Sequence, residues 1–328
     1  MAQVTSEPAA GLPPTEPDQV NVEVSQQVVG RSPWELFWRR FRRDKFAIGG
    51  LILVIFMLTV ALLAPLIATL YHGPNEVHLD RLDEFGIPTG PQADFPFGLD
   101  TAGRDLMVRV AYGARTSLFI AFFATGLATT IGVTLGMLAG FYRGKVDTVI
   151  SRTIDVVLSL PVLLLALGLV SACGLSASGC LFGLIQPGLL LVSYIIALFT
   201  WPYIARIVRG QVLSLREKEF IESARSLGAR NRRIMFREIL PNVAASIIVY
   251  TTLIIPNNIL FEAALSFLGV GVPQETPSWG RQLSDAGTIF TVAWWMMLFP
   301  GLFLFITTLA FNLVGDGLRD ALDPKTGG

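Results

Sequence analysis

The sequence predicts an all-α membrane protein with six transmembrane helices and both chain ends in the cytoplasm. Of its 328 residues, 52% are hydrophobic and only 15% are charged. Several stretches without any charged residue are long enough to cross the ~30 Å hydrocarbon core of a bilayer, which takes about 20 helical residues. The basic residues gather in alternate connecting segments, as they do in multi-pass membrane proteins. These three observations indicate a multi-pass protein of the cytoplasmic membrane.

The charge-free stretches define the predicted spans. They cover 46–75, 116–142, 156–205, 239–261 and 286–315. The stretch 156–205 is long enough for two helices, and its Gly-, Ser- and Cys-rich part at 171–183 is expected to divide them. The six predicted spans are about 47–70, 117–141, 153–172, 184–205, 243–268 and 294–315.

The distribution of Lys and Arg predicts the orientation in the membrane. Twenty of the 25 Lys and Arg residues lie in four segments that alternate with segments holding the other five. The four richer segments are 31–45, 143–152, 206–237 and 319–325. Because cytoplasmic loops carry the excess of Lys and Arg, both termini are predicted to be cytoplasmic. The loop at 206–241 then faces the compartment that contains ATP.

Residues 1–30 are predicted to be a disordered cytoplasmic tail, because they contain no Lys or Arg and no long apolar run. Ser32 and Glu35 form a capping-box pattern, after which aromatic residues recur at helical spacing opposite arginines. Segment 31–45 is therefore predicted to be an amphipathic helix in the inner membrane interface, with a charged flank to the first span as the alternative. The remaining boundaries are a membrane domain at 46–316, an outer loop within it at 71–116, and a cytoplasmic tail at 317–328.

The loop at 206–241 carries nine Lys or Arg residues and a helix–glycine–helix pattern. Ser214 and Glu217 form a capping-box pattern that predicts the start of the first helix. Gly228 stands where a left-handed cap would end that helix, and a second short helix is expected up to Pro241. Charge alone leaves open a loop that is anchored by lipid phosphates.

The spacing within this loop follows the pattern E-A-A-x3-G-x9-I-x-L-P, with Ser223 and Glu238 as the two departures. The loop therefore resembles the cytoplasmic EAA loop in the membrane subunits of ATP-binding-cassette (ABC) importers. The resemblance implies a type I importer permease fold, in which the first helix of the loop docks into a cleft of the ATPase subunit. The residues to which it assigns this coupling are Glu222, Ser223, Ala224, Leu227, Gly228, Ala229, Leu240 and Pro241.

A second motif lies in the predicted outer loop, where residues 97–118 read FGLDTAGRDLMVRVAYGARTSL. Charge alone predicts only solvated ion pairs here, each worth ~1 kcal/mol or less. The full pattern, however, resembles a signature of the C-type permease subunit in dipeptide and oligopeptide importers. Its matching residues are Gly98, Asp100, Gly103, Arg104, Asp105, Arg109, Tyr112, Gly113, Arg115, Ser117 and Leu118. Further similar segments lie at 144–167, 273–287, 293–301 and 311–325.

Together the two resemblances imply one half of the pore of an ABC importer that carries peptides across the cytoplasmic membrane. The implied partners are a homologous second permease in a heterodimer, one or more cytoplasmic ATP-binding subunits, an extracytoplasmic substrate-binding protein and membrane lipid, with no nucleic acid. ATP and Mg²⁺ are expected on the ATPase subunit, and no cofactor is expected on this chain. The alternative is an ion-coupled carrier or gated channel, which would need charge relays or ion-binding breaks in its helices.

Glu262 is the one acidic residue deep in the fifth predicted span, close to Asn257 and Asn258. A charge at that depth is costly and should face a partner or a water-filled path. Two interpretations stay open: these three residues line a translocation pathway, or Glu262 is a buried, hydrogen-bonded structural residue. Glycines recur every four residues from Gly132 to Gly144, which predicts a ridge for the close packing of another helix.

No catalytic residue and no metal site are expected on this chain. The nearest match to a phosphate-binding loop, at 140–146, has three residues between its glycines instead of four, and ends on Val146 instead of Ser or Thr. His72 and His78 are six residues apart in the outer loop, without an accompanying cluster of ligands in the sequence. The energy for transport must then come from another chain.

The two cysteines, Cys173 and Cys180, both fall between the third and fourth predicted spans. The predicted orientation places this connection outside the cytoplasm, where disulfides persist. A disulfide across so short a loop is expected to contribute on the order of 2–3 kcal/mol of local ordering. Two unpaired thiols are the alternative.

Overall fold

The computed structural model describes residues 33–175 and 186–322, and these are almost entirely helical. Within these two ranges the extended backbone pairs only at two isolated β-bridges, so the predicted all-α class is confirmed. The predicted tail at 1–30 and the capping residue Ser32 lie outside the described residues. The elements are α1 (Pro33–Phe41), α2 (Lys45–Leu70), the 3-10 helix η1 (Leu79–Arg81), α3 (Leu106–Tyr142), α4 (Gly144–Ser159), α5 (Val162–Leu175), α6 (Leu189–Leu215), α7 (Glu219–Ser226), α8 (Asn231–Arg233), the π-helix η2 (Ile234–Ile239), α9 (Leu240–Phe267), α10 (Trp279–Ala286) and α11 (Trp295–Leu322).

Five helices in the described ranges are long and apolar enough to cross a membrane: α2, α3, α6, the continuous helix Asn231–Phe267, and α11. A sixth span results if α4 and the segment Val162–Cys173 are counted together, although they meet at an angle of 87°. The third span is therefore bent and is not the single helix predicted at 153–172. The cause is Pro161, because its ring disfavours the helical conformation at Leu160, which is extended at φ −81° and ψ 144°.

The second span begins well before the predicted position, 117. Asp105 caps α3 by accepting the backbone N–H groups of Met107 at 2.8 Å and Val108 at 3.3 Å. The helix is consequently 37 residues long, about 55 Å at 1.5 Å per residue. The charge-free stretch starts at residue 116, directly after Arg115. It therefore marks the apolar part of this helix and not its first residue. The predicted outer loop is correspondingly shorter and ends at Asp105.

The last helix also exceeds its prediction. α11 continues to Leu322, so the predicted tail at 317–328 starts as helix. Its final turns pack against α1, where Phe37 and Phe41 form a small buried cluster with Ala321. Part of the aromatic face that was predicted to contact the membrane interface is therefore covered by α11.

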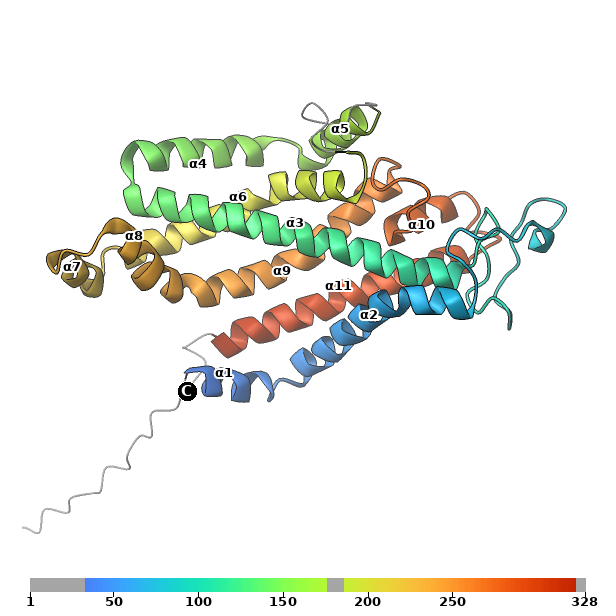
Figure 1. The fold of residues 1–328 in the computed structure, drawn as a ribbon, viewed down its shortest axis with the longest axis horizontal. Helices are drawn as coiled ribbons and strands as arrows, with labels where there is room; N and C mark the ends of the chain where they lie inside the picture. Colours follow the sequence, from blue (N-terminus) through green and yellow to red (C-terminus); the bar gives the residue numbers. More distant parts are fainter. Residues whose placement is uncertain (1–32, 176–185, 323–328) are drawn as a thin grey trace, which may run out of the picture.

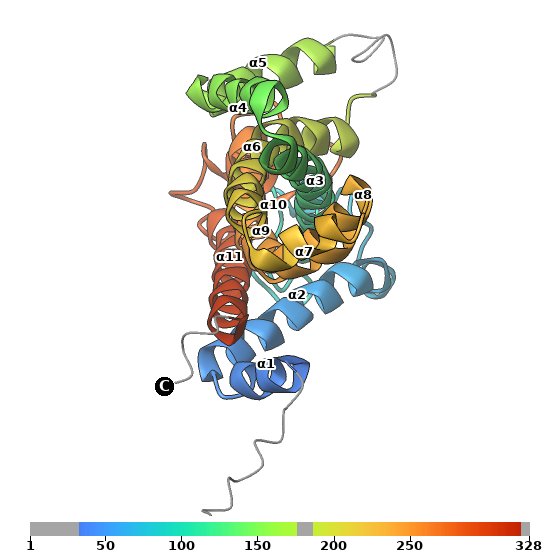
Figure 2. The same ribbon diagram turned by 90° about the vertical axis from the view of Figure 1, so that its left-hand side faces the viewer.

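Figures 1 and 2 show α3, α6 and α9 in the middle of the bundle, α4 and α5 along one edge, and α1, α2 and α11 along the other. α3 packs closely on α6 through the predicted glycine ridge. A Cβ atom on Gly132, Gly136 or Gly140 would lie only 2.6–2.8 Å from an atom of α6, so these glycines let the helices approach. The ridge is confirmed at these three positions. Gly144 does not belong to it, because it begins α4 with a φ of +56°.

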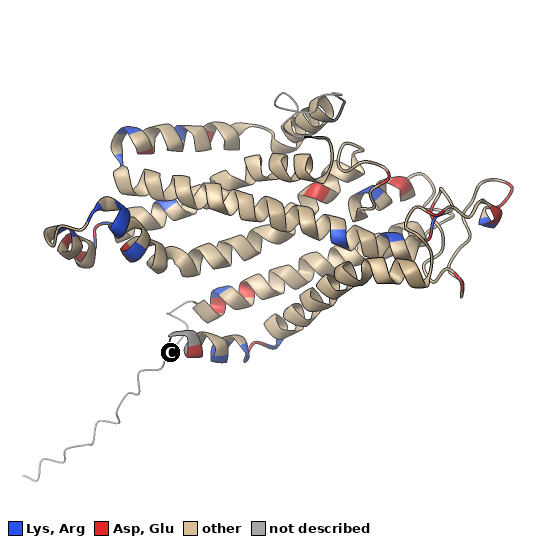
Figure 3. Cartoon of the chain, in the orientation of Figure 1, with Lys and Arg blue, Asp and Glu red and all other residues tan. Residues whose placement is uncertain are grey.

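The two ends of the bundle differ in charge. Lys and Arg gather at the end that carries α1, α7 and α8, whereas the middle of the bundle has few charged residues (Figure 3). We call this the basic end. The opposite end, formed by the segment 71–105 and α10, is called the loop end (Figure 1). The positive-inside rule predicts that the basic end is cytoplasmic.

Candidate functional site

The loop at 206–241 places a short helix, α7, beyond the ends of the long helices at the basic end (Figures 1 and 2). α6 remains helical past Ser214, and α7 begins only at Glu219, without a side-chain capping bond. The predicted capping box of Ser214 and Glu217 is therefore wrong. The box does not form because α6 keeps a buried side up to Val212, so Ser214 lies inside the last turn of α6 and does not start a new helix.

Gly228 ends α7 in the left-handed conformation that the sequence predicts, with a φ of +78°. Its N–H donates to the carbonyl of Arg225 at 2.9 Å, and the N–H of Ala229 donates to the carbonyl of Ala224 at 3.0 Å. These two bonds form a Schellman motif, which closes the end of a helix. A Cβ on Gly228 would have no described atom within 4 Å, so the backbone conformation, and not lack of space, requires glycine.

α7 is held against the bundle by one buried side chain and by contacts with an aromatic ring. Ile221 is fully buried and lies in the same apolar cluster as Ile234 of η2 and Phe141 of α3. The guanidinium groups of Arg216 and Arg225 each lie 5.8 Å from the centroid of the Phe141 ring, and Arg216 also donates to the Phe141 carbonyl. Ile221 and Arg225 thus hold α7 against the bundle, and Arg216 holds the segment just before it.

The other side of α7 is open and mixes acidic, polar and apolar side chains. Glu222 and Ser223 are exposed, and Ala224 is half-buried. Leu227, which follows the last turn, is 89% exposed, and Phe236 of η2 is 57% exposed. Large apolar side chains beside exposed polar ones are typical of a surface that another protein covers.

The second helix of the loop does not end at Pro241, contrary to the prediction. α8, η2 and α9 form one continuous helix over Asn231–Phe267. A proline has no N–H to donate, and its ring crowds the carbonyl four residues earlier in an α-helix. The π-helical turn before Pro241, in which the N–H of Leu240 donates to the carbonyl of Met235, avoids that arrangement. Leu240 and Pro241 thus lie in the first turn of α9.

Ion pairs connect the loop at 206–241 to the ends of α3 and α4. Arg209 donates two hydrogen bonds to the carboxylate of Asp147. Arg143 donates to Glu217, and this hydrogen bond holds the pKa of the Glu217 carboxyl below its usual range. The Arg143–Glu217 pair is exposed and contributes little stability, whereas the two-bond pair of Arg209 fixes a geometry.

The two asparagines predicted in the translocation pathway lie in different environments. Asn257 is exposed and lines a pocket of about 490 Å³ between α6 and α9, together with Tyr203. Asn258 is buried, where its amide donates to Thr125 at 2.8 Å and accepts from Thr200 at 3.0 Å. Asn258 therefore joins α3, α6 and α9. Asn257 faces the pocket, where its side chain is accessible to a bound molecule.

Glu262 is completely buried in α9. Its two carboxylate oxygens accept hydrogen bonds from Ser117 at 2.8 Å and from Ser266 at 2.7 Å. A buried carboxylate that is satisfied in this way matches the structural interpretation, one of the two that the sequence left open. Spacing could not predict this arrangement, because Ser117 lies in another helix, 145 residues away.

The signature segment forms a buried ion-pair network at the loop end, not the solvated pairs that charge alone predicts. Asp100 is 3% exposed and lies 2.8 Å from Nε of Arg104 and 3.2 Å from Nε of Arg109. Arg109 is fully buried, and its Nη1 donates to the carbonyl of Pro74 and to Oδ1 of Asn75, both at 3.1 Å. Arg109 thereby holds the segment after α2 against the start of α3.

The expectation that the two histidines lack accompanying ligand groups is wrong. One potential ligand atom from each of His72, Glu76 and His78 lies within 4.8 Å of the other two. Sequence reasoning missed Glu76 because it is the path of the loop that brings the three side chains together.

Of the predicted disulfide, Cys173 lies near the end of α5 but Cys180 lies outside the described residues, so the bridge stays a prediction.

Two known families match this chain. The family described as a binding-protein-dependent transport system inner membrane component matches residues 132–328, more than half of the chain. The N-terminal TM domain of oligopeptide transport permease C matches residues 32–83. The first match contains the loop at 206–241, and the second contains α1 and α2.

Similar individual proteins cover almost the whole chain. The glutathione transport system permease protein GsiD of Escherichia coli O6:K15:H31 (strain 536) is 41% identical over 317 residues, 97% of this chain and 95% of that protein. The dipeptide transport system permease protein DppC of Alkalihalophilus pseudofirmus is 40% identical over 299 residues, 91% of this chain and 92% of that protein. A solved chain of the MetNI methionine ABC transporter, in an inward-facing conformation, has a TM-score of 0.55 at 20% identity and covers 66% of this chain and 98% of its own.

Proposed function

The chain belongs to the family of binding-protein-dependent transport system inner membrane components, and from this membership we propose that it forms one half of an ATP-driven pore for peptides. Membership identifies it as the membrane-spanning permease of an ABC importer, and not as an ion-coupled carrier. It is a multi-pass protein of the cytoplasmic membrane. Permeases of this family work with an ATPase subunit and a substrate-binding protein, and they are not enzymes themselves.

The observation that carries the proposal is the exposed side of α7. We call Glu222, Ser223, Ala224 and Leu227 the docking face. An exposed helix that is anchored to the long helices can transmit force from a partner that covers it, whereas a free loop cannot. The docking face is proposed to enter a cleft of the ATPase subunit. In this proposal Gly228 and Ala229 close the turn behind the docking face, and Leu240 and Pro241 begin the helix that follows.

The pocket between α6 and α9 supports the proposal that a second, homologous permease completes the pore. Tyr203 is 53% exposed and Asn257 is exposed beside it, so the pocket wall is open on one side in the single chain. Two such walls facing each other would enclose a path with aromatic and amide groups along it. Asn257 is the residue that we assign to this path. Asn258 and Glu262 support its wall from behind.

The proposed cycle follows from the position of the docking face. ATP and Mg²⁺ bind on the ATPase subunits, and this chain contributes no cofactor of its own. Closure of the two ATPase subunits brings the two docking faces together, and the helices attached to them tilt and open the pore towards the outside. Hydrolysis then returns the pair to the inward-open state, which is a rigid-body transition of packed helices.

The proposed substrates are small peptides. Two relatives of similar length carry the names of glutathione and dipeptide permeases, and both substrates are short peptides. The substrate-binding protein, which would dock at the loop end, can supply the selectivity, so the path itself needs no tight site. Membrane lipid is the remaining partner, and it would contact α1, where Trp38 is 42% exposed and Arg42 lies 5.0 Å from its ring centroid.

A pair of matched substitutions tests the assignment of the docking face. Leu227→Asp places a charge in the docking face, and Phe85→Asp does the same at the loop end, where Phe85 is 86% exposed. Both variants should insert and fold, because neither side chain is buried. Co-purification of the ATPase subunit should fall for Leu227→Asp and stay unchanged for Phe85→Asp, and ATP-dependent uptake into proteoliposomes should fall for Leu227→Asp. ATPase retention and uptake at the wild-type level in Leu227→Asp would refute the assignment.

A further inference from the structure

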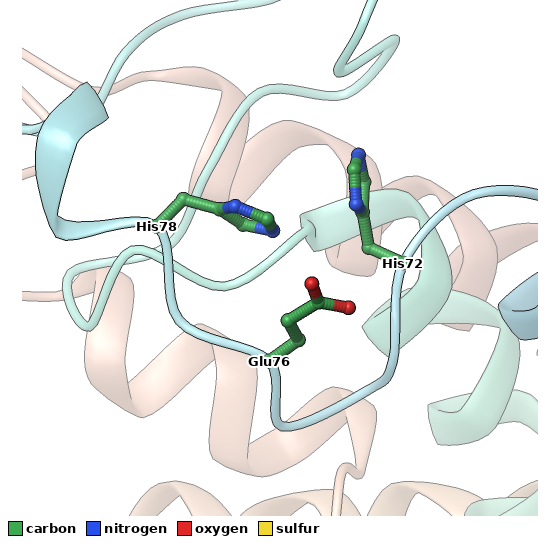
Figure 4. Close-up of side chains that lie close together, drawn as sticks. All are labelled: His72, Glu76 and His78. Carbon is green, nitrogen blue, oxygen red and sulfur yellow. The ribbon is translucent and has the colours of Figure 1, made fainter.

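Three side chains that commonly bind metals face one another in the segment that follows α2 (Figure 4). His72, Glu76 and His78 each offer one ligand atom, and these atoms lie within 4.8 Å of one another. His72 is the second residue after the end of α2, and His78 directly precedes η1. The function proposed above does not use any of the three.

The two imidazole rings are held in place by their neighbours. Their centroids are 4.5 Å apart, with the edge of one ring against the other, and Phe95 stacks on His72 at 4.9 Å. Phe95 also lies 5.2 Å from the ring of His78. Nε2 of His78 is buried and has no hydrogen-bond partner among the described residues. A buried polar nitrogen in that position calls for an explanation, and a bound cation supplies one.

The backbone around the three side chains is fixed by long-range contacts. The N–H of His78 donates to the carbonyl of Gly103 at 2.8 Å, and Arg109 holds the carbonyl of Pro74 from the other side. Gly103 has a φ of +74°, and a Cβ there would lie 3.0 Å from the carbonyl oxygen of His78. The close approach that places His78 therefore depends on glycine at 103. Such support around the ligands favours metal binding, because less order has to be gained on binding.

Glu76 is oriented by its own loop. Its Oε2 accepts a hydrogen bond from the N–H of Gly73 at 2.8 Å, which leaves Oε1 available to a cation. A carboxylate whose second oxygen is hydrogen-bonded in this way is the usual arrangement around a protein-bound metal. The side chain is exposed, so solvent and ions can reach the group.

We propose that His72, Glu76 and His78 bind one divalent transition-metal ion of the zinc class, with solvent in the remaining position. Two imidazoles and one carboxylate are a typical zinc ligand set, whereas Mg²⁺ and Ca²⁺ prefer oxygen ligands only. Bonds of ~2.1 Å in tetrahedral geometry place ligand atoms about 3.4 Å apart, so small side-chain rotations would complete the site. The ion would tie the end of α2 to the segment packed against the start of α3. It would stiffen the loop end where the binding protein is proposed to dock.

The test uses the fact that these are the only two histidines of the chain. The protein is purified with a tag that contains no histidine, stripped of metal, and titrated with Zn²⁺ against a chromophoric chelator and with Co²⁺ by absorption. We expect one equivalent of either ion, a Co²⁺ spectrum typical of low coordination number, and a higher melting temperature with Zn²⁺. Absence of stoichiometric binding to the wild-type protein would overturn the proposal.

Variants separate this site from nonspecific surface binding. Glu76→Gln keeps an oxygen that can accept the Gly73 hydrogen bond but removes the charge, and it should lower the Zn²⁺ affinity at least tenfold without changing the metal-free melting temperature. His78→Ala should abolish the Co²⁺ spectrum. Glu84→Gln removes an exposed charge from the same loop and serves as the matched control, with unchanged affinity. Equal affinities in Glu76→Gln and Glu84→Gln would also overturn the proposal.

Discussion

The hydroxyl of Ser117 in α3 donates a 2.8 Å hydrogen bond to the carboxylate of Glu262 in α9, and it does so inside the fully buried part of the bundle. Ser266, one turn further along α9, donates to the other carboxylate oxygen at 2.7 Å. The acidic residue that stood out in the sequence therefore joins two membrane helices. Ser117 is also a residue of the outer signature, so this motif reaches from the loop end into the membrane.

Substitution of Glu262 should reduce stability more than transport. Glu262→Ala leaves the hydroxyls of Ser117 and Ser266 without their acceptor, and each buried unsatisfied group costs ~1–3 kcal/mol. Glu262→Gln should cost less, because the amide oxygen can still accept one bond. Thermal unfolding of the purified complex measures the loss, and uptake per assembled complex should stay near wild type. A Glu262→Gln complex that assembles normally but fails to transport would instead favour the pathway interpretation.

Replacement by alanine should destabilise the protein at one glycine of α3 and not at another. A Cβ on Gly136 would lie 2.6 Å from the carbonyl oxygen of Ala205, whereas a Cβ on Gly126 would meet no described atom within 4 Å. Gly136→Ala should destabilise the protein by ~1–3 kcal/mol through overpacking. Gly126→Ala should be neutral or stabilising by up to ~1 kcal/mol, because alanine favours helix. Equal melting temperatures for the two variants would contradict the close approach of α3 and α6.

The turn behind the docking face should tolerate asparagine but not valine. Gly228 has a left-handed backbone, which costs most L-residues ~1–2 kcal/mol, while asparagine adopts it more readily. Gly228→Val should therefore weaken ATPase association and lower uptake by about tenfold, the factor that ~1.4 kcal/mol represents. Gly228→Asn should retain both activities. The variants are compared by co-purification and proteoliposome uptake, and equal loss in both would show that side-chain size, not backbone conformation, matters there.

Thiol chemistry tests the predicted pairing of Cys173 and Cys180. The native, unreduced protein should react with no thiol reagent even after unfolding, and reduction should expose two reactive groups. Cys180→Ser should leave one thiol that labels without reduction. Two reactive thiols in the unreduced, unfolded wild-type protein would exclude the bridge.

Features that depend on neighbouring residues were predictable. The left-handed cap at Gly228 and the glycine ridge around Gly136 follow from spacing, because each is a requirement of the backbone near that residue. The bend of the third span could also have been predicted, because Pro161 restricts the backbone of the residue before it. The search for charge-free stretches missed the bend because it considers only which residues are charged and not the backbone.

Features that depend on distant residues were not predictable from spacing. Burial of Arg109 requires Asp100 on one side and the loop at 74–75 on the other, and only folding brings them together. Glu76 is close in sequence to the two histidines, but the path of their loop depends on distant partners, because Arg109 holds Pro74 and the carbonyl of Gly103 accepts from His78. Predicting that Pro241 lies inside a continuous helix would have required knowing of the π-helical turn before it, and no residue type in that turn indicates it.

The uninterrupted helix over Asn231–Phe267 has a mechanical consequence. Asn231 lies at the basic end and Asn257 in the pocket wall, and the 26 residues between these positions correspond to about 39 Å along the helix at 1.5 Å per residue. For a straight helix of this length, a change of about 5° in tilt would displace one end by about 3 Å relative to the other. In the cycle proposed above, movement of the ATPase subunits would reach Asn257 along this one helix, and a more flexible π-helical turn would reduce the displacement that reaches it.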